Sequence, residues 1–71
     1  MQIHLNGQVF CLAEAKLAEP ASVVDLLGAL DLVGKRLAVE VNEEIIPKSR
    51  HATRLLQAND QVEIVHAIGG G

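Results

Sequence analysis

Aromatic side chains are almost absent from this 71-residue chain, which contains one Phe and no Tyr or Trp. Proteins that bind single-stranded nucleic acid commonly stack the bases on aromatic rings, so this mode of binding is poorly supported. Acidic residues outnumber basic ones, and the formal net charge of -3 repels phosphate backbones and anionic membrane surfaces. We therefore expect neither a nucleic-acid partner nor a membrane partner.

Cysteine and long apolar runs are also scarce. The single cysteine, Cys11, cannot form a disulfide within the chain, which fits a reducing compartment. No apolar run approaches the roughly 18 residues that a membrane helix needs. The first residues show no basic stretch followed by an apolar core, so we expect no secretory signal and a cytoplasmic location.

Aliphatic residues dominate what is present, and a composition of 49% hydrophobic and 21% charged residues is typical of one globular domain. Asn6-Gly7 separates two strand-like runs, and this dipeptide favours a two-residue hairpin turn because both positions adopt positive φ. Such a turn pairs Leu5 with Gln8. The inward face then carries Ile3, Leu5, Phe10 and Leu12, and the outward face carries Gln2, His4, Val9 and Cys11.

The segment SVVDLLGAL, residues 22–30, has the pattern of a helix. Ser22 followed three residues later by Asp25 resembles a capping box, with Asp in place of the usual Glu. Gly34 is placed to end or to follow this helix. The apolar residues at helical spacing are Val23, Leu26, Leu27 and Leu30.

The second half of the chain predicts strands. In RLAVEVN apolar and polar residues alternate, which predicts a half-buried strand. NEE then forms a turn that leads into IIP. This is predicted to be a short edge strand, because Pro47 has no N–H to donate to a neighbouring strand. SRHATRLL is expected to hold one helical turn, with Leu55 and Leu56 in the core. The next segment, Ala58-Asn59-Asp60, is expected to form a turn. QVEIVHA is the last strand. The residues expected inward are Leu37, Val39, Val41, Val62 and Ile64, and those expected outward are Ala38, Glu40, Glu63 and Val65.

This order of elements predicts an α+β fold. An amphipathic helix must cover the apolar face of the sheet, and the long crossover through it allows a later strand to run parallel to an earlier one. The arrangement that satisfies both is the β-grasp, or ubiquitin-like, fold: a mixed four- to five-stranded sheet packed on one main helix. We expect residues 1–66 to form this domain and residues 67–71 to form a flexible C-terminal glycine tail.

Side-chain chemistry offers little for catalysis. The three histidines are far apart in sequence and lack other ligands at metal-binding spacing, so we expect solvated or packed histidines, no metal and no cofactor. Cys11 lacks a local base or helix N-terminus that would activate it. The glutamates around the outward face form a solvated surface rather than an acid–base pair: Glu40, Glu43, Glu44 and Glu63.

The chain ends in three glycines, Gly69, Gly70 and Gly71. A phosphate-binding glycine loop opens a helix, and nothing follows Gly71 here. Because glycine has no Cβ, a partner can enclose the backbone from all sides, and residues 67–71 span at most about 17 Å when extended. One interpretation is a passive binding module with a frayed end. The other is a tail that enters a narrow channel of a partner.

The group that such a tail delivers is the C-terminal carboxylate. A carboxylate is a poor electrophile, but ATP can convert it to an acyl-adenylate, from which a sulfur nucleophile displaces AMP. The product is a protein thiocarboxylate. The sequence has no nucleotide-binding motif, so a partner enzyme would have to bind the ATP.

Three stretches together resemble the ThiS family, the ubiquitin-like sulfur carriers of thiamine thiazole biosynthesis: MQIHLNGQ, LAVEVNEEIIPKS and DQVEIVHAIGGG. The resemblance covers nearly the whole chain. Its most specific part is VN followed by IIP, combined with a C-terminal Gly-Gly at this length. The family's Gly-Gly corresponds to Gly70 and Gly71, and Gly69 departs mildly from the shorter pattern.

The resemblance implies a protein co-substrate rather than an enzyme. An E1-like, ThiF-type adenylyltransferase would use ATP to activate Gly71, sulfur would come by a cysteine desulfurase route, and a ThiG-type thiazole synthase would accept it. We expect Val65, Ala67 and Ile68 to contact partners, because they border the tail. The alternatives are the small subunit of molybdopterin synthase, which shares the fold and the tail, and a modifier for tRNA thiolation or protein conjugation.

Overall fold

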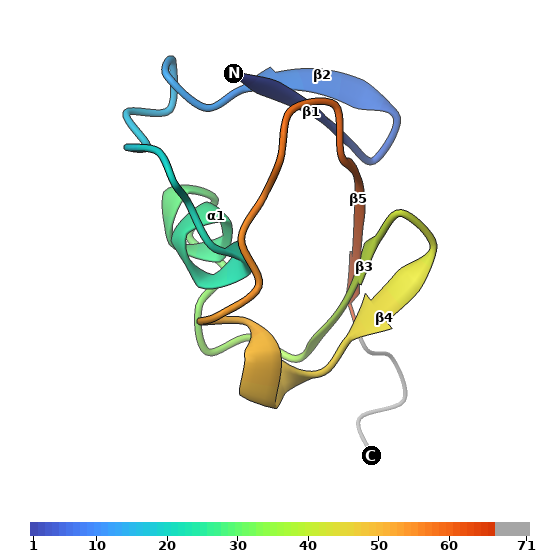
Figure 1. Ribbon diagram of the computed structural model, residues 1–71. Helices are drawn as coiled ribbons and strands as arrows, with labels where there is room; N and C mark the ends of the chain where they lie inside the picture. The colour runs from blue at the N-terminus through green and yellow to red at the C-terminus, as the bar shows by residue number, and fades with distance from the viewer. Residues whose placement is uncertain (67–71) are drawn as a thin grey trace.

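A computed structural model describes residues 1–66 of the chain (Figure 1). One five-stranded sheet has the strand order β2-β1-β5-β3-β4, and α1 lies across one of its faces. The elements are β1 (Gln2–Leu5), β2 (Gln8–Cys11), α1 (Val23–Ala29), β3 (Leu37–Val41), β4 (Glu44–Ile46), the 3-10 helix η1 (Lys48–Arg50) and β5 (Gln61–His66). The predicted order of a hairpin, a helix, a strand, a short strand, a turn and a last strand is confirmed.

The N-terminal hairpin has the predicted register, with Ile3 opposite Phe10 and Leu5 opposite Gln8. Asn6 and Gly7 adopt φ values of 50° and 82°, as a two-residue turn of this kind requires. β1 also pairs with β5, and these two strands are parallel, whereas β3 pairs antiparallel with both β4 and β5. The sheet is therefore mixed, as the crossover through the helix predicted.

Both ends of α1 are closed by local hydrogen bonds. The backbone N–H of Asp25 donates to the Ser22 hydroxyl over 3.1 Å, and the Ser22 N–H donates to the Asp25 carboxylate over 2.9 Å, which confirms the capping box. At the other end the Leu32 N–H donates to the Leu27 carbonyl over 2.8 Å, the six-to-one bond of a Schellman motif. The left-handed residue of this motif is Asp31, with φ 59°, and Gly34 follows in the next turn.

The core lies between α1 and the sheet, and most residues predicted to face inward are in it or pack against it. Leu55 is the exception, with 47% of its surface exposed. It forms an isolated antiparallel bridge with Ser22, so its backbone is extended there, and adjacent residues of an extended chain point to opposite sides. The core members are Ile3, Leu12, Val23, Leu26, Leu27, Val39, Val41, Ile46, Leu56, Val62 and Ile64.

The arrangement leaves the second face of the sheet, here called the outer face, uncovered by any other element of residues 1–66 (Figure 1). α1 has seven residues, and within residues 1–66 no helix reaches the length and apolar character that crossing a membrane takes. β5 lies in the centre of the sheet between β1 and β3. The last described residues of the chain therefore belong to the central strand.

Candidate functional site

The candidate site lies where the chain leaves β5. The predicted site residues beyond this point lie outside the described residues: Ala67, Ile68, Gly69, Gly70 and Gly71. His66 ends β5 and is paired with Leu37, the first residue of β3. The geometry that can be described is thus that of the strand from which residues 67–71 continue.

Asn6 fixes this end of β5 from the side of β1. Its amide oxygen accepts a hydrogen bond from the Ile64 N–H over 2.8 Å, and its amide nitrogen donates to the Ile64 carbonyl over 3.2 Å. The paired residues of β1 reach only as far as Val62 on β5, so the Asn6 side chain extends the pairing by two residues. The sequence pattern identified Asn6 only as a turn residue, because its partner is 58 positions away.

Asn42 and Asp60 fix the opposite end of β5. The Asn42 amide oxygen accepts from the Gln61 N–H over 2.9 Å, and its amide nitrogen donates to the Asp60 carboxylate over 3.0 Å. Asp60 is only 5% exposed, and its other carboxylate oxygen accepts from the Gln57 N–H over 2.8 Å. Neither role follows from the sequence pattern around these residues. An asparagine in a turn with positive φ, as at Asn6 and Asn42, is the signal that both positions share.

The outer face carries the apolar residues that were predicted to point away from the core. Val65 is 57% exposed and Val9 is 60% exposed. Val65 pairs directly with the exposed Ala38 across β3 and β5, which places two small apolar side chains beside the end of β5. The outward orientation of Val65 is therefore confirmed, and its role in binding a partner stays a prediction.

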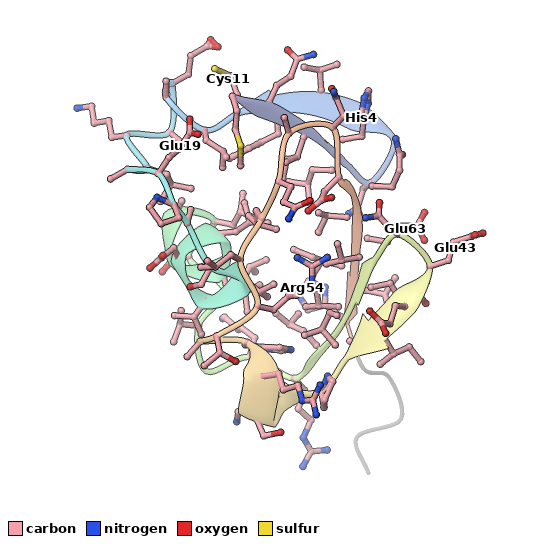
Figure 2. The ribbon with its side chains drawn as sticks, in the orientation of Figure 1. His4, Cys11, Glu19, Glu43, Arg54 and Glu63 are labelled. Carbon is pink, nitrogen blue, oxygen red and sulfur yellow. The ribbon has the colours of Figure 1, made fainter. Side chains whose placement is uncertain are left out.

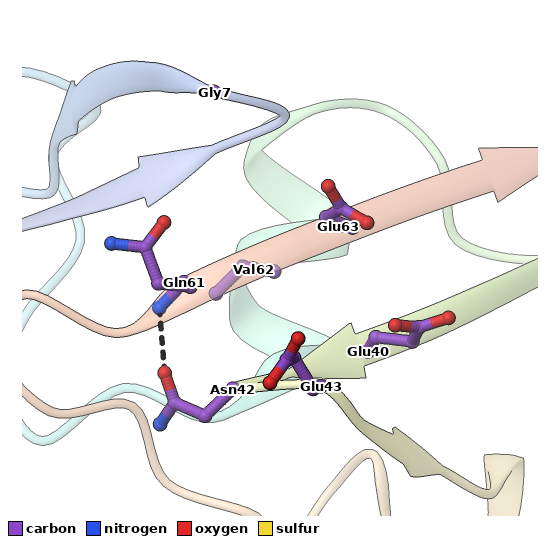
Figure 3. Close-up of a pocket in the computed structure, with 7 residues that line it drawn as sticks. All are labelled: Gly7, Glu40, Asn42, Glu43, Gln61, Val62 and Glu63. Carbon is purple, nitrogen blue, oxygen red and sulfur yellow. Dashed lines mark hydrogen bonds between the residues drawn. The ribbon is translucent and has the colours of Figure 1, made fainter.

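Acidic residues lie beside this apolar pair. Glu40 and Glu63 are directly opposite each other in the pairing of β3 and β5. With Glu43 they line a cleft of about 500 Å³ on the outer face (Figure 3). Figure 2 shows Glu43 and Glu63 together at one side of the molecule, away from Cys11 and Glu19. Like charges that face each other across a ladder destabilise a sheet, so folding does not explain this pair.

The remaining titratable groups have structural surroundings. His51 is 7% exposed, and its Nε2 lies 2.9 Å from the Ile46 carbonyl oxygen, so it is a packed histidine. Within residues 1–66, no group of three or more His, Cys, Asp or Glu side chains could hold a metal ion. The Met1 amino group donates to Glu19 over 2.8 Å, and this hydrogen bond raises the pKa of the amino group above its ordinary value. Cys11 is half-buried at the end of β2.

Known proteins of similar sequence and structure agree on one family. The chain is 31% identical to the sulfur carrier protein ThiS of Escherichia coli over the full length of both. It is 38% identical to a thiazole synthase of Magnetococcus marinus, but it spans only 20% of the length of that protein. A crystal structure of a thiamine biosynthesis protein (ThiS) from Geobacter metallireducens superimposes with a TM-score of 0.83 at 28% identity, covering all of both chains.

The structural match confirms the predicted α+β fold, a mixed five-stranded sheet with one helix in the β-grasp arrangement. The sequence model of the ThiS family matches residues 3–71, which includes the glycines at the end. The chain therefore belongs to the ThiS family.

Proposed function

We propose that the chain carries sulfur as a thiocarboxylate on the C-terminal carboxyl group of Gly71 and delivers it to a thiazole synthase. Membership of the ThiS family supports the carrier role. The match to part of a thiazole synthase supports a thiazole synthase as the recipient of the sulfur, because that protein contains a stretch that is similar to this chain. The observation that carries the proposal is that the central strand of the sheet leads directly into Ala67-Ile68 and three glycines.

Two steps load the carrier. The carboxylate of Gly71 attacks the α-phosphorus of ATP, pyrophosphate leaves, and an acyl-adenylate forms. In the second step a persulfide from a cysteine desulfurase route attacks the acyl carbon and displaces AMP, which gives an acyl disulfide. A second thiol of the sulfur donor then attacks the donor sulfur of this disulfide, so that the thiocarboxylate leaves and a disulfide remains on the donor. An E1-like, ThiF-type adenylyltransferase binds the ATP, so this chain acts as a co-substrate with no bound cofactor.

The chain divides by role into a body, residues 1–66, and a tail, residues 67–71. Glycines at positions 69–71 present no side chain, so a channel that fits an extended backbone accepts them without a clash. Ala67 and Ile68 are the last side chains before the glycines, and we assign them contacts at the mouth of this channel. The body stays outside the channel and supplies a docking surface.

The outer face is that docking surface in this proposal. Val65 and Ala38 form an exposed apolar pair beside the end of β5, and Glu40 and Glu63 border it. A central apolar contact with a charged rim is the usual composition of a protein interface. The molybdopterin and tRNA-thiolation alternatives share the tail chemistry, but family membership favours the thiazole pathway.

Intact-mass measurement tests the carrier role. The chain is incubated with ATP, the adenylyltransferase and a sulfur donor, and a mass gain equal to exchanging one oxygen for sulfur, localised to the C-terminal peptide, is expected. A variant that lacks Gly70 and Gly71 keeps its fold and shows no gain. An unchanged mass of the wild-type chain with demonstrably active partners would refute the proposal, as would a modified variant.

A matched pair of substitutions tests the docking surface. Val65→Asp places a charge in the apolar pair, and Leu55→Asp makes the same chemical change at a side chain that is 47% exposed and away from the outer face. Val65→Asp is expected to weaken binding to a partner at least about tenfold, equivalent to about 1.4 kcal/mol, while Leu55→Asp leaves it unchanged. Equal affinities of the two variants for both partners would remove the outer face from the proposal.

A further inference from the structure

A second surface lies on the opposite side of the sheet, in a groove between α1, the α1–β3 loop and the segment around η1. Its volume is about 500 Å³. The Val24 N–H donates to the His51 carbonyl over 2.9 Å, which fixes the segment after η1 against the start of α1. The apolar residues that line the groove are Val24, Leu27, Leu32, Val33, Leu37 and Ala52.

Positive charge collects at this groove although the chain as a whole is acidic. Lys35, Arg36 and Lys48 line it, which is half of the 6 Lys and Arg residues in the sequence, and no lining residue is acidic. Lys35 and Lys48 form neither an ion pair nor a side-chain hydrogen bond with any residue that the structure describes. An apolar floor beneath unpaired cations fits a ligand that combines an apolar side chain with negative charge.

His51 adds a polar group to the groove. Its Nε2 is engaged by the Ile46 carbonyl, and Nδ1 has no hydrogen-bond partner within residues 1–66. His51 is largely buried and is one of the residues that line the groove.

The groove lies next to the strand pair that ends at His66. Lys35 and Leu37 lie at its rim, and Leu37 is paired with His66, the residue from which the tail continues. The side chain of Leu37 is directed toward the core with those of Val39 and Val41, so the groove and the outer face lie on opposite sides of the sheet. His66, the last described residue, therefore belongs to a strand that has Val65 and acidic residues on its outer face and the basic groove on the opposite side of the sheet.

We propose that the groove binds an acidic segment of a tail-processing partner protein, with one apolar side chain on the floor and carboxylates at Lys35 and Lys48. This inference rests on the proposed function, because the partner is a protein that binds the tail. A partner that holds the tail in a channel and contacts both flanking surfaces fixes the carrier in one orientation. The outer face alone leaves the carrier free to tilt about the tail.

Two double variants of equal charge test the proposal. The groove variant, Lys35→Glu with Lys48→Glu, reverses two of the positive charges in the groove. The control, Lys16→Glu with Arg50→Glu, makes the same change of net charge at exposed residues that do not line the groove. Affinity for the purified adenylyltransferase and thiazole synthase is measured at low and high salt. We expect the groove variant to bind at least one partner about tenfold or more weakly, and the control to stay within about twofold of the wild type.

Val33→Asp tests the apolar floor independently. Val33 is 63% exposed in the loop after α1, so the substitution leaves folding intact, and weaker binding to the same partner is expected. Three results would refute the binding role of the groove: wild-type affinity of the groove variant for both partners, an equal loss of affinity in the control, or wild-type affinity of Val33→Asp. In each of these cases the wild-type chain still forms the thiocarboxylate, so the proposed function is unaffected. Failure of the wild-type chain to form the thiocarboxylate would overturn both the function and the inference that rests on it.

Discussion

Replacing Asn6 by glycine removes the side chain that connects the first turn to the last strand, and its effect can be worked out from the structure. Two hydrogen bonds to the Ile64 backbone, of 2.8 and 3.2 Å, are lost. Each contributes about 0.5–1.5 kcal/mol to the free energy of unfolding. Glycine accepts the φ of 50° without strain, and it adds about 0.5–1 kcal/mol of backbone entropy to the unfolded chain.

The sum predicts a loss of about 2 kcal/mol or somewhat more, a large fraction of the roughly 5 kcal/mol available to a domain of this size. Equilibrium unfolding in urea measures this loss. Hydrogen exchange adds a local readout, because the Ile64 amide donates to Asn6 and is expected to exchange faster relative to the amides of β3.

Asn59→Gly is the matched control. Asn59 has a φ of 69°, and its side chain has no hydrogen bond with any residue among 1–66, so the same substitution there removes no such contact. We expect only the entropic cost of glycine, a loss of about 0.5–1 kcal/mol. Equal losses of stability in the two variants, or unchanged exchange at Ile64 in Asn6→Gly, would refute the role assigned to Asn6.

Three further substitutions test other contacts. Glu63→Gln relieves the like-charge pair with Glu40 and is expected to raise the free energy of unfolding by about 0.2–1 kcal/mol in urea titrations, less as salt is added; no gain at low salt would contradict this. Asp60→Asn leaves one of two donors without an acceptor and is expected to cost about 1–3 kcal/mol by the same assay, whereas wild-type stability would contradict it. Glu19→Gln is expected to lower the pKa of the Met1 amino group toward its ordinary value in an NMR titration. Because folding raises this pKa, the contribution of the pair is complete below the ordinary pKa and is lost as pH rises through the folded value.

Local signals predicted the elements well. Asn6-Gly7 determined a turn and a register because both residues adopt positive φ, and Ser22 with Asp25 determined the start of α1 by hydrogen bonds within one turn. Leu55 was predicted wrongly because apolar character alone does not show which of two adjacent residues faces the core. That choice depends on the extended backbone that pairs with Ser22, more than 30 positions earlier.

The surfaces near the end of β5 were less predictable, because they too depend on contacts between distant parts of the chain. Val65 was placed on the outer face because alternation along one strand is a local property. The groove joins Val24, Lys35 and Lys48, which share no local pattern and are brought together only by the packing of η1 against α1. The tail chemistry stays a prediction, because residues 67–71 lie outside the described residues.

The position of β5 bears on the proposed carrier role, in which a partner holds and releases residues 67–71. An edge strand such as β2 or β4 has one neighbour, and force applied to its end would separate it from the sheet. β5 has two neighbouring strands, and side-chain amides from Asn6 and Asn42 extend its hydrogen bonding at both ends. A partner that holds residues 67–71 therefore acts on a strand that is hydrogen-bonded to a neighbouring strand on each side. Binding of the tail by a partner then orients the domain and does not pull an edge strand away from the sheet.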